Sequence, residues 1–175
     1  MKELETERLF LRRLTPGDAG FVLELLNDPD WLRFIGDRGV RTLEDARDYI
    51  VKGPMEMYAQ FGLGLLLVEM KEGHAPAGIC GLIRRESLED VDLGFAFLPA
   101  FRGKGFAYES AAAALAYGVG VLRLPRIVAI TSPENDRSAK LLEKLGFRFE
   151  KMIRLSGETE DARLFATGSP RPSES

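Results

Sequence analysis

The chain has 175 residues, of which 45% are hydrophobic and 29% charged, and its formal net charge is −3. These values predict one globular domain with a sizeable core, and the small negative charge argues against a general nucleic-acid partner. The chain has a single cysteine, which excludes disulfide frameworks and metal sites built from several cysteines. It has a single histidine, which excludes multi-histidine metal sites and makes Ser-His-Asp chemistry a poor candidate. We therefore expect no metal cofactor.

Neither a targeting signal nor a membrane span is expected from the pattern. The opening segment, MKELETERLF, is charged throughout, unlike a signal peptide. The longest charge-free apolar stretch, near residues 111–122, is shorter than the about 20 residues that cross a bilayer. We expect a cytoplasmic protein without a membrane partner. We also expect a single domain over residues 1–167, and a disordered tail over 168–175 because the sequence there is of low complexity.

The N-terminal part of the chain predicts one strand and two helices. Residues 8–14 (RLFLRRL) alternate apolar and polar side chains, as a strand does. Residues 15–26 begin with a Thr-Pro helix start and continue with apolar side chains at helical spacing. A polar loop is expected over 27–39 (NDPDWLRFIGDRG). A second helix is expected over 42–60, interrupted or ended at its Gly-Pro pair.

Beyond this point the chain changes to short apolar runs separated by turns, with two further helices. The first three runs predict an antiparallel meander, and small residues in the next helix suit packing against a sheet. The later helix has an Asn at its start and a Gly after its end, the residues that begin and end helices. In order, we expect strands at 64–70, 75–83 and 91–98, a helix at 105–122, a buried strand at 126–131, a helix at 135–145, and closing strands at 147–155 and 161–167.

Residues 91–131 thus form a strand, a helix and a strand, which predicts a right-handed parallel crossover. The fold class is α/β (α+β): a mixed, mostly antiparallel sheet of six or seven strands with helices on both faces. In such sheets ligands favour the carboxyl ends of the parallel strands. The segment Arg102-Gly103-Lys104-Gly105 is expected at that end.

The bend at residues 102–105 has the composition of an anion site. A helix start offers unpaired backbone N–H groups and a partial positive charge. Gly103 and Gly105 let the backbone approach an oxyanion without a Cβ in the way, and Arg102 and Lys104 add positive charge. The pattern predicts a phosphate or pyrophosphate site. The alternative is an ordinary strand-to-helix turn with solvated cations.

Of three phosphate-binding patterns, one fits. A P-loop needs Ser or Thr after its Lys, where this chain has Gly105. A dinucleotide fingerprint needs a third glycine at position 108, which is Tyr, and an acidic residue about 20 positions on, which is lacking between Ser110 and Pro133. The pattern Arg/Gln-x-x-Gly-x-Gly/Ala is matched by residues 102–107 (RGKGFA) at every defined position. In this the chain resembles the acetyl-CoA pyrophosphate loop of the GNAT (general N-acetyltransferase) superfamily.

Two other blocks extend the resemblance, in the same order along the chain as in the ribosomal-protein N-terminal acetyltransferase (RimJ/RimL-type) branch. The opening LETERLFLRRLTPGDA is similar to the first strand and helix cap of that branch, and PENDRSAKLLEKLGF resembles its Asn-x-x-Ser helix ending in Gly-Phe. Between them, VDLGFAFLPAFRGKGFAYES resembles the strand, bend and helix start. The resemblance implies the GNAT fold with a splayed parallel strand pair, and transfer of acetyl from acetyl-CoA to a primary amine by direct attack.

The resemblance also implies where the cofactor binds. The pantetheine arm would lie along the end of the strand before the bend, and the pyrophosphate on the backbone amides of the bend. Asn135 and Lys140 would contact the cofactor from the following helix, although Asn135 equally suits an N-cap and Lys140 a solvated position. The implied cofactor residues are Phe97, Leu98, Arg102, Gly103, Lys104, Gly105, Phe106, Ala107, Asn135 and Lys140.

Two side chains are candidates for proton transfer. Asp92 occupies the place of the acidic residue that opens the corresponding strand in the branch, so it is the expected base, with Glu86 second. A strand-end charge in solvent or in an ion pair is the alternative for Asp92. Ser138 matches the Ser to which protonation of the leaving thiolate is assigned, and a surface helix position is its alternative. A backbone N–H near Leu98 would stabilise the oxyanion.

The acceptor, a protein N-terminal amine or another small primary amine, would enter over residues 27–39 and the second helix. Trp31, Arg33 and Phe34 are the expected walls, although the aromatic pair would equally anchor the loop to the core. Two other functions remain open: a non-catalytic acyl-CoA-binding module and, less favoured, a nucleotide-dependent oxidoreductase. The sequence gives no oligomeric state.

Overall fold

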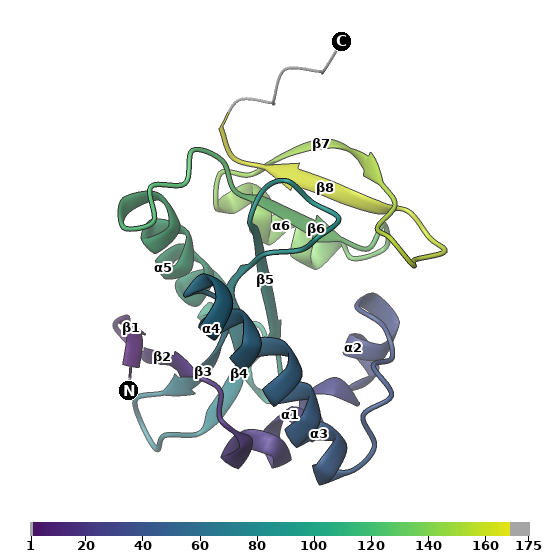
Figure 1. The fold of residues 1–175 in the computed structure, drawn as a ribbon. Coiled ribbons are helices and arrows are strands. Elements are labelled where there is room, and N and C mark those ends of the chain that lie inside the picture. The colour runs from purple at the N-terminus through teal and green to yellow at the C-terminus, as the bar shows by residue number, and fades with distance from the viewer. Residues whose placement is uncertain (1, 169–175) are drawn as a thin grey trace.

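The computed structural model describes residues 2–168 of the chain. These residues form one eight-stranded sheet covered by helices (Figure 1). The strands are β1 (Lys2–Glu5), β2 (Leu9–Arg13), β3 (Leu65–Met70), β4 (Pro76–Ile83), β5 (Asp92–Phe97), β6 (Val128–Thr131), β7 (Arg148–Ile153) and β8 (Ala162–Ala166). The α-helices are α1 (Ala19–Leu26), α2 (Pro29–Phe34), α3 (Leu43–Ile50), α4 (Glu56–Phe61), α5 (Phe106–Gly120) and α6 (Asp136–Lys144).

The strand order is β1-β2-β3-β4-β5-β6-β8-β7, and every neighbouring pair is antiparallel except β5 and β6. This confirms the predicted mixed, mostly antiparallel sheet. The sheet has one strand more than the upper expected number because β1, Lys2–Glu5, pairs with β2. The segment KELE has too few apolar residues to be recognised as a strand, and its pairing with a neighbour makes it one.

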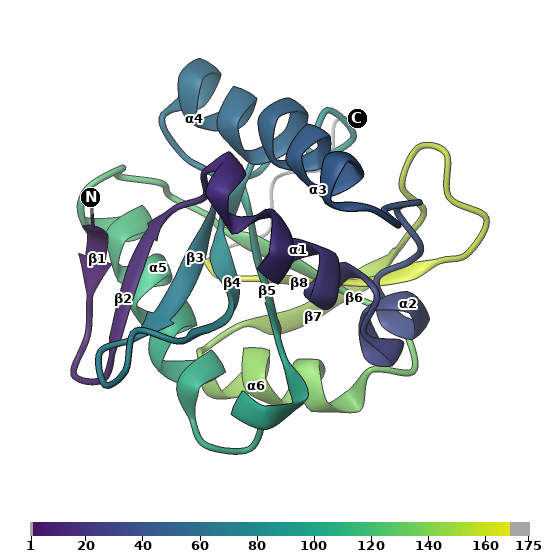
Figure 2. The same ribbon diagram turned by 90° about the horizontal axis from the view of Figure 1, so that it is seen from below.

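Helices cover both faces of the sheet, as predicted. Seen from below, α1, α3 and α4 lie on one side of the strands and α6 on the other (Figure 2). Alternate residues of the central strands face the two layers, which is the two-residue period of a strand. On β3 and β4, Leu67 and Ile79 pack with the core of α1, α2 and α3, whereas Val68 and Cys80 pack with that of α5 and α6.

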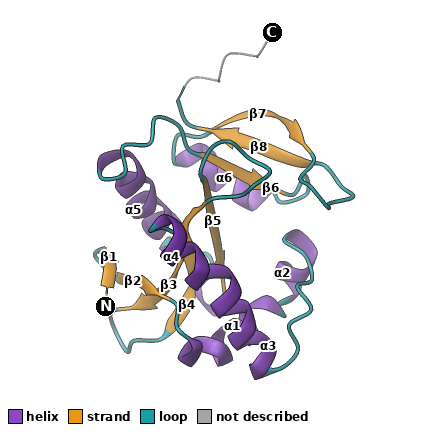
Figure 3. Ribbon diagram, in the orientation of Figure 1, coloured by secondary structure: helices purple, strands orange, loops and turns teal. Residues whose placement is uncertain are grey.

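The parallel pair separates almost as soon as it forms. β5 and β6 pair at Asp92 and Val128, with Val128 N–H donating to the Val91 carbonyl oxygen at 3.0 Å. Beyond this point β5 stays paired with β4 and diverges from β6 (Figure 3). The expected splayed strand pair is therefore present, and it opens at the carboxyl ends of both strands.

The structure corrects the loop expected over residues 27–39, because its first part is the helix α2. The side chain of Asp28 caps the helix by accepting a hydrogen bond from the Asp30 N–H at 3.1 Å, and Pro29 occupies the first turn. These are ordinary helix-start signals, and the short length of α2 masked them. The second predicted helix is interrupted as expected, since a π-helical turn over Val51–Met55 containing Pro54 joins α3 to α4.

Within the part of the chain that the structure describes, no helix is long and apolar enough to cross a membrane. The expected tail lies almost wholly outside the described residues, which end at 168. The single-domain boundary and the cytoplasmic location stay predictions.

Candidate active site

A cleft of about 550 Å³ opens where β5 and β6 separate. Its walls come from α2, β5, β6, the start of α6 and the loop between β7 and β8. This is the size of pocket that holds a small-molecule ligand. The cleft brings together these predicted residues: Trp31, Arg33, Phe34, Asp92, Asn135 and Ser138. Phe97, Leu98, the bend at 102–107 and Lys140 are not part of its lining.

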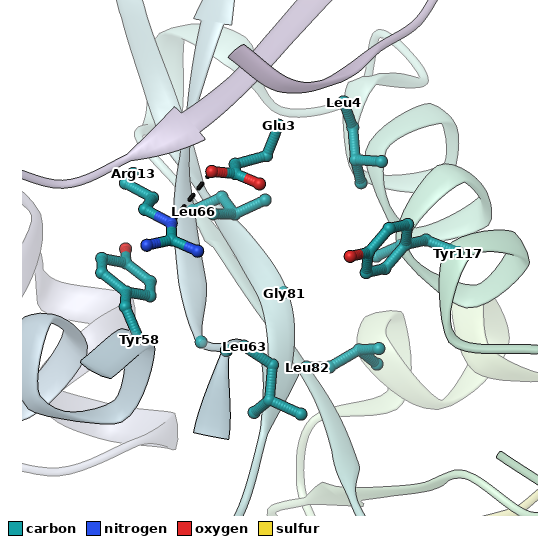
Figure 4. Close-up of a pocket in the computed structure, with 12 residues that line it drawn as sticks. Glu3, Leu4, Arg13, Tyr58, Leu63, Leu66, Gly81, Leu82 and Tyr117 are labelled. Atoms are coloured by element: carbon teal, nitrogen blue, oxygen red, sulfur yellow. Dashed lines mark ion pairs between the residues drawn. The ribbon is translucent and has the colours of Figure 1, made fainter. Parts of the chain in front are cut away.

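A second hollow, of about 40 Å³, lies between β1–β4 and the helices α4 and α5 (Figure 4). An ion pair between Arg13 and Glu3 (2.9 Å) lies beside it, and Tyr58 and Tyr117 contribute to its lining. Its volume is suited to a water molecule or two. It is therefore too small for an organic ligand.

Asp92 is a buried carboxylate in the wall of the cleft. It opens β5 and is 1% exposed. The Nε of Arg85 lies 3.3 Å and 3.2 Å from its two carboxylate oxygens. Burial raises the pKa of Asp92, and the neighbouring Arg85 opposes that rise. A solvated strand-end charge is thus wrong for Asp92, and the ion-pair alternative holds. A carboxyl group with a raised pKa in a cleft is also suited to proton transfer.

Arg85 was not among the predicted site residues, and it also lines the cleft. Glu86, the second candidate base, is exposed and lies outside the cleft lining. The two residues are adjacent in sequence, so only the path of the chain between β4 and β5 decides which one reaches Asp92. No local pattern could have separated them.

The β6-facing edge of β5 carries open backbone groups. The N–H of Leu98 donates to the Ala77 carbonyl oxygen at 2.9 Å, so this amide is not available to an oxyanion. Hydrogen-bonding sides alternate along an antiparallel strand. The N–H groups of Phe95 and Phe97 therefore point away from β4, toward the gap where β6 has separated. If a backbone N–H near Leu98 binds the oxyanion, as predicted, it is one of these neighbours and not that of Leu98 itself.

The bend before α5 has the geometry that the sequence suggested. Gly103 and Gly105 have φ values of 75° and 85°, in the left-handed region that favours glycine. Gly105 is the N-cap of α5 and supplies no side-chain cap. The first helical hydrogen bond runs from the Glu109 N–H to the Gly105 carbonyl oxygen (3.0 Å). The N–H groups of Phe106 and Ala107 have no acceptor within the helix, and the bend thus fits an anion.

The side chain of Arg102 points to α2. Its guanidinium donates to Asp28 Oδ2 at 2.6 Å, to Asp30 Oδ2 at 2.9 Å and to the Phe97 carbonyl oxygen at 3.0 Å. Two carboxylates thus already compensate the positive charge of Arg102. Lys104, by contrast, is exposed at the bend.

Arg8 brings a second, unpredicted cation to the bend. Its Nη1 donates to the Lys104 carbonyl oxygen at 3.0 Å, and its Nε donates to Glu109 Oε1 at 2.9 Å. The guanidinium carbon also lies 4.4 Å from the centre of the Phe106 ring. Because 96 residues separate Arg8 from Lys104, no sequence spacing indicated this contact.

The start of α6 forms the opposite wall of the cleft. Asn135 Oδ1 accepts a hydrogen bond from the Ser138 N–H at 3.2 Å, which confirms the capping interpretation of Asn135. Ser138 is half-buried in the cleft wall. Lys140 is exposed and lies outside that wall. Catalysis by Ser138 stays a prediction.

On α2, Trp31 is 5% exposed and packs in the core with Leu98, so it anchors this segment as well as lining the cleft. Its indole N–H has no acceptor among the described residues. Arg33 is largely exposed, lies over the ring of Phe34 and faces Glu134 at 3.7 Å. The predicted acceptor wall is therefore one buried anchor, Trp31, followed by the exposed Arg33 and the half-buried Phe34.

A mixed sheet with one splayed parallel pair, a cleft at the splay and an open-amide bend before the next helix together are the architecture of acetyltransferases of the GNAT fold. The chain belongs to the GNAT acetyltransferase family: the family model described as Acetyltransferase (GNAT) domain matches residues 8–148. It is therefore an acetyltransferase by family.

Individual relatives agree with this assignment. The chain is 32% identical to the uncharacterized N-acetyltransferase p20 of Bacillus licheniformis, over 88% of this chain and 86% of that protein. It is 31% identical to the [Ribosomal protein uS5]-alanine N-acetyltransferase of Escherichia coli, over 63% of this chain and 58% of that protein. The crystal structure of an acetyltransferase from Agrobacterium tumefaciens has a TM-score of 0.80 and 25% identity, covering 95% of this chain and 94% of that one. The resemblance to the RimJ/RimL-type branch is thereby confirmed.

Proposed function

We propose that this protein transfers the acetyl group of acetyl-CoA directly to a primary amine bound in the cleft between β5, β6 and α2. The observation that carries the proposal is the buried Asp92 in the wall of a cleft along the open edge of β5, in a chain whose next helix, α5, begins with open backbone amides. Acetyl-CoA supplies an activated acetyl thioester when bound.

The bend would hold the diphosphate of the coenzyme. The amides of Phe106 and Ala107 have no helical acceptor, and Lys104 and Arg8 add positive charge beside them. The open edge of β5 would hold the pantetheine arm through the N–H groups of Phe95 and Phe97. A backbone donor on that edge would also bind the carbonyl oxygen as it becomes negative.

Asp92 would accept the proton that the amine loses when its nitrogen bonds to the acetyl carbon. Ser138 would supply a proton to the sulfur as the carbon–sulfur bond breaks. Direct attack is favoured over a cysteine acyl-enzyme because the chain has one cysteine, Cys80, which is fully buried in the core. Burial raises the pKa of the Cys80 thiol to about 12, so it stays protonated and unreactive.

The relative that acetylates ribosomal protein uS5 at an alanine supports a protein N-terminal amine as one acceptor. A non-catalytic acyl-CoA-binding module would have the same bend and cleft. Catalytic turnover, measured as release of the CoA thiol, distinguishes an acetyltransferase from such a module. No described contact favours the nucleotide-dependent oxidoreductase, and the family assignment opposes it.

The test has two steps. Thermal-shift measurements with acetyl-CoA, NAD and ATP should raise the unfolding temperature with acetyl-CoA alone, because a ligand that binds only the folded state stabilises it. A free-thiol release assay should then detect turnover with at least one member of a panel of amines, including Ala- and Ser-initiated peptides and polyamines. Binding without thiol release over the whole panel would favour the binding module. A shift with NAD and none with acetyl-CoA would overturn the proposal.

A further inference from the structure

We propose that the side chain of Arg102 is a positioning residue for the amine acceptor, holding the acceptor wall α2 against the cofactor strand, rather than a ligand of the diphosphate. The inference rests on the proposed function for the identity of the two ligands. It departs from the phosphate contact that the sequence motif suggested for this side chain.

The first support is the way the guanidinium is bound. All three of its nitrogens are engaged: Nη2 with Asp28 (2.6 Å), Nη1 with Asp30 (2.9 Å) and Nε with the Phe97 carbonyl oxygen (3.0 Å). The Arg102 side chain is 23% exposed and the Asp28 side chain 6% exposed. A planar guanidinium can satisfy this set of acceptors at once, and its charge is compensated before any phosphate arrives.

The second support is where the two acids lie. Asp28 is the N-cap of α2, and its Oδ2 accepts both from Arg102 and from the Asp30 N–H (3.1 Å). α2 has six residues, too few to be stable without tertiary contacts. It is held at the end of β5 by the packing of Trp31 with Leu98 and by the bridge to Arg102. Loss of the bridge removes the polar half of that attachment.

The third support is the position of α2 in the cleft. Trp31, Arg33 and Phe34 of this helix line the cleft, whereas neither Arg102 nor the bend does. A displacement of α2 therefore changes the acceptor side of the cleft while leaving the open amides of the bend in place. Misplacement of a bound reactant by about 1 Å can cost about 100-fold in rate.

The test compares two variants of the bridge with a matched control. Arg102→Lys keeps the positive charge and loses the planar guanidinium that bridges the two carboxylates. Asp30→Asn removes the charge of one of those carboxylates. Because the Asp30 side chain is 44% exposed, this second variant is expected to fold even if the first does not. The control is Arg12→Lys, because Arg12 also bridges two carboxylates, Asp18 (2.8 Å) and Glu69 (3.0 Å), and also donates to a backbone carbonyl, away from the cleft.

The first readout needs no turnover. The chain has a single tryptophan, Trp31, and it lies on α2. Both bridge variants should raise the acrylamide quenching constant of its fluorescence by about twofold or more, because a loosened helix exposes the indole, and Arg12→Lys should not. Calorimetric titration with CoA should give a Kd within about threefold of wild type in all three variants, a small change on the free-energy scale.

The second readout is the KM for the best amine of the panel, which should rise about tenfold in both bridge variants and stay unchanged in Arg12→Lys. CoA binding weakened about tenfold in Arg102→Lys, with Trp31 quenching unchanged, would make Arg102 a phosphate ligand and overturn the inference. Raised quenching with an unchanged acceptor KM would overturn it as well. If no amine is acetylated, the proposed function fails, while quenching and calorimetry still decide whether Arg102 holds α2.

Discussion

Asp92→Asn should lower kcat/KM for the acceptor amine by at least about 100-fold, the usual contribution of a positioned general base. The amide keeps the shape of the side chain in its buried site at the start of β5 and cannot take a proton. The loss should appear in a free-thiol release assay at saturating acetyl-CoA, while the CoA Kd stays at the wild-type value.

The same substitution should not weaken the fold at neutral pH. Because burial raises the pKa of Asp92 in the folded state, its ionised form is destabilising there, and wild type gains stability as the pH falls through that raised pKa. The free energy of unfolding of Asp92→Asn minus that of wild type should therefore be larger at neutral pH than in acid. Denaturant titrations at several pH values measure this difference. Arg85, which loses its partner, is partly exposed and can be hydrated.

Asp18→Asn is the matched control, since Asp18 is also a largely buried carboxylate paired with an arginine, Arg12 at 2.8 Å, and it lies outside the cleft. It should lose stability and keep activity.

The pH dependence of activity gives a further check. In wild type, kcat/KM should fall as the pH is lowered and Asp92 becomes protonated, and Asp92→Asn should lack this fall in kcat/KM at acid pH. An Asp92→Asn enzyme within about threefold of wild-type kcat/KM would remove Asp92 from the mechanism.

Gly103→Ala should weaken acetyl-CoA binding by at least about tenfold, or about 1.4 kcal/mol. A Cβ at this position meets no heavy atom of the protein within 4 Å, so the added methyl group would project into the open space at the bend, where the diphosphate is proposed to lie. The φ of 75° also favours glycine, so some loss of stability is expected, about 1–2 kcal/mol.

Gly73→Ala separates these two effects. Gly73 has a φ of 78°, its Cβ would likewise meet nothing within 4 Å, and it lies in the turn between β3 and β4, outside the cleft. It should lose a similar amount of stability and bind acetyl-CoA as wild type does. Equal acetyl-CoA affinities for the two variants, measured by calorimetry, would mean that the bend does not hold the coenzyme.

The elements that the sequence predicted well are those with local signals. The crossover from β5 through α5 to β6 follows from two apolar runs around a long alanine-rich helix, and the cap of α6 follows from Asn135. The bend was recognisable because two glycines with positive φ stand at a helix start. The missed elements, β1 and α2, are short. β1 is a strand through its pairing with the neighbouring β2, and α2 is held by contacts with a distant part of the chain.

The sequence predicted which residues lie at the candidate site better than it predicted the contacts between their side chains. Asp92 and Ser138 do lie in one cleft with the predicted acceptor wall, whereas most of the predicted cofactor residues lie outside its lining. The carboxylate partners of Arg102 are 74 and 72 residues away, and Arg8 reaches the bend across 96 residues. A motif states which residue types occur at a bend, whereas tertiary packing decides which carboxylate or carbonyl group a guanidinium reaches.

The most direct measurement is a crystal structure of the protein with CoA bound. We predict that the diphosphate accepts hydrogen bonds from backbone N–H groups of residues 103–107 and that the thiol end enters the gap between β5 and β6, near Asp92. Coenzyme bound elsewhere on the protein, or a bend whose amides all turn inward to protein acceptors in that complex, would contradict it.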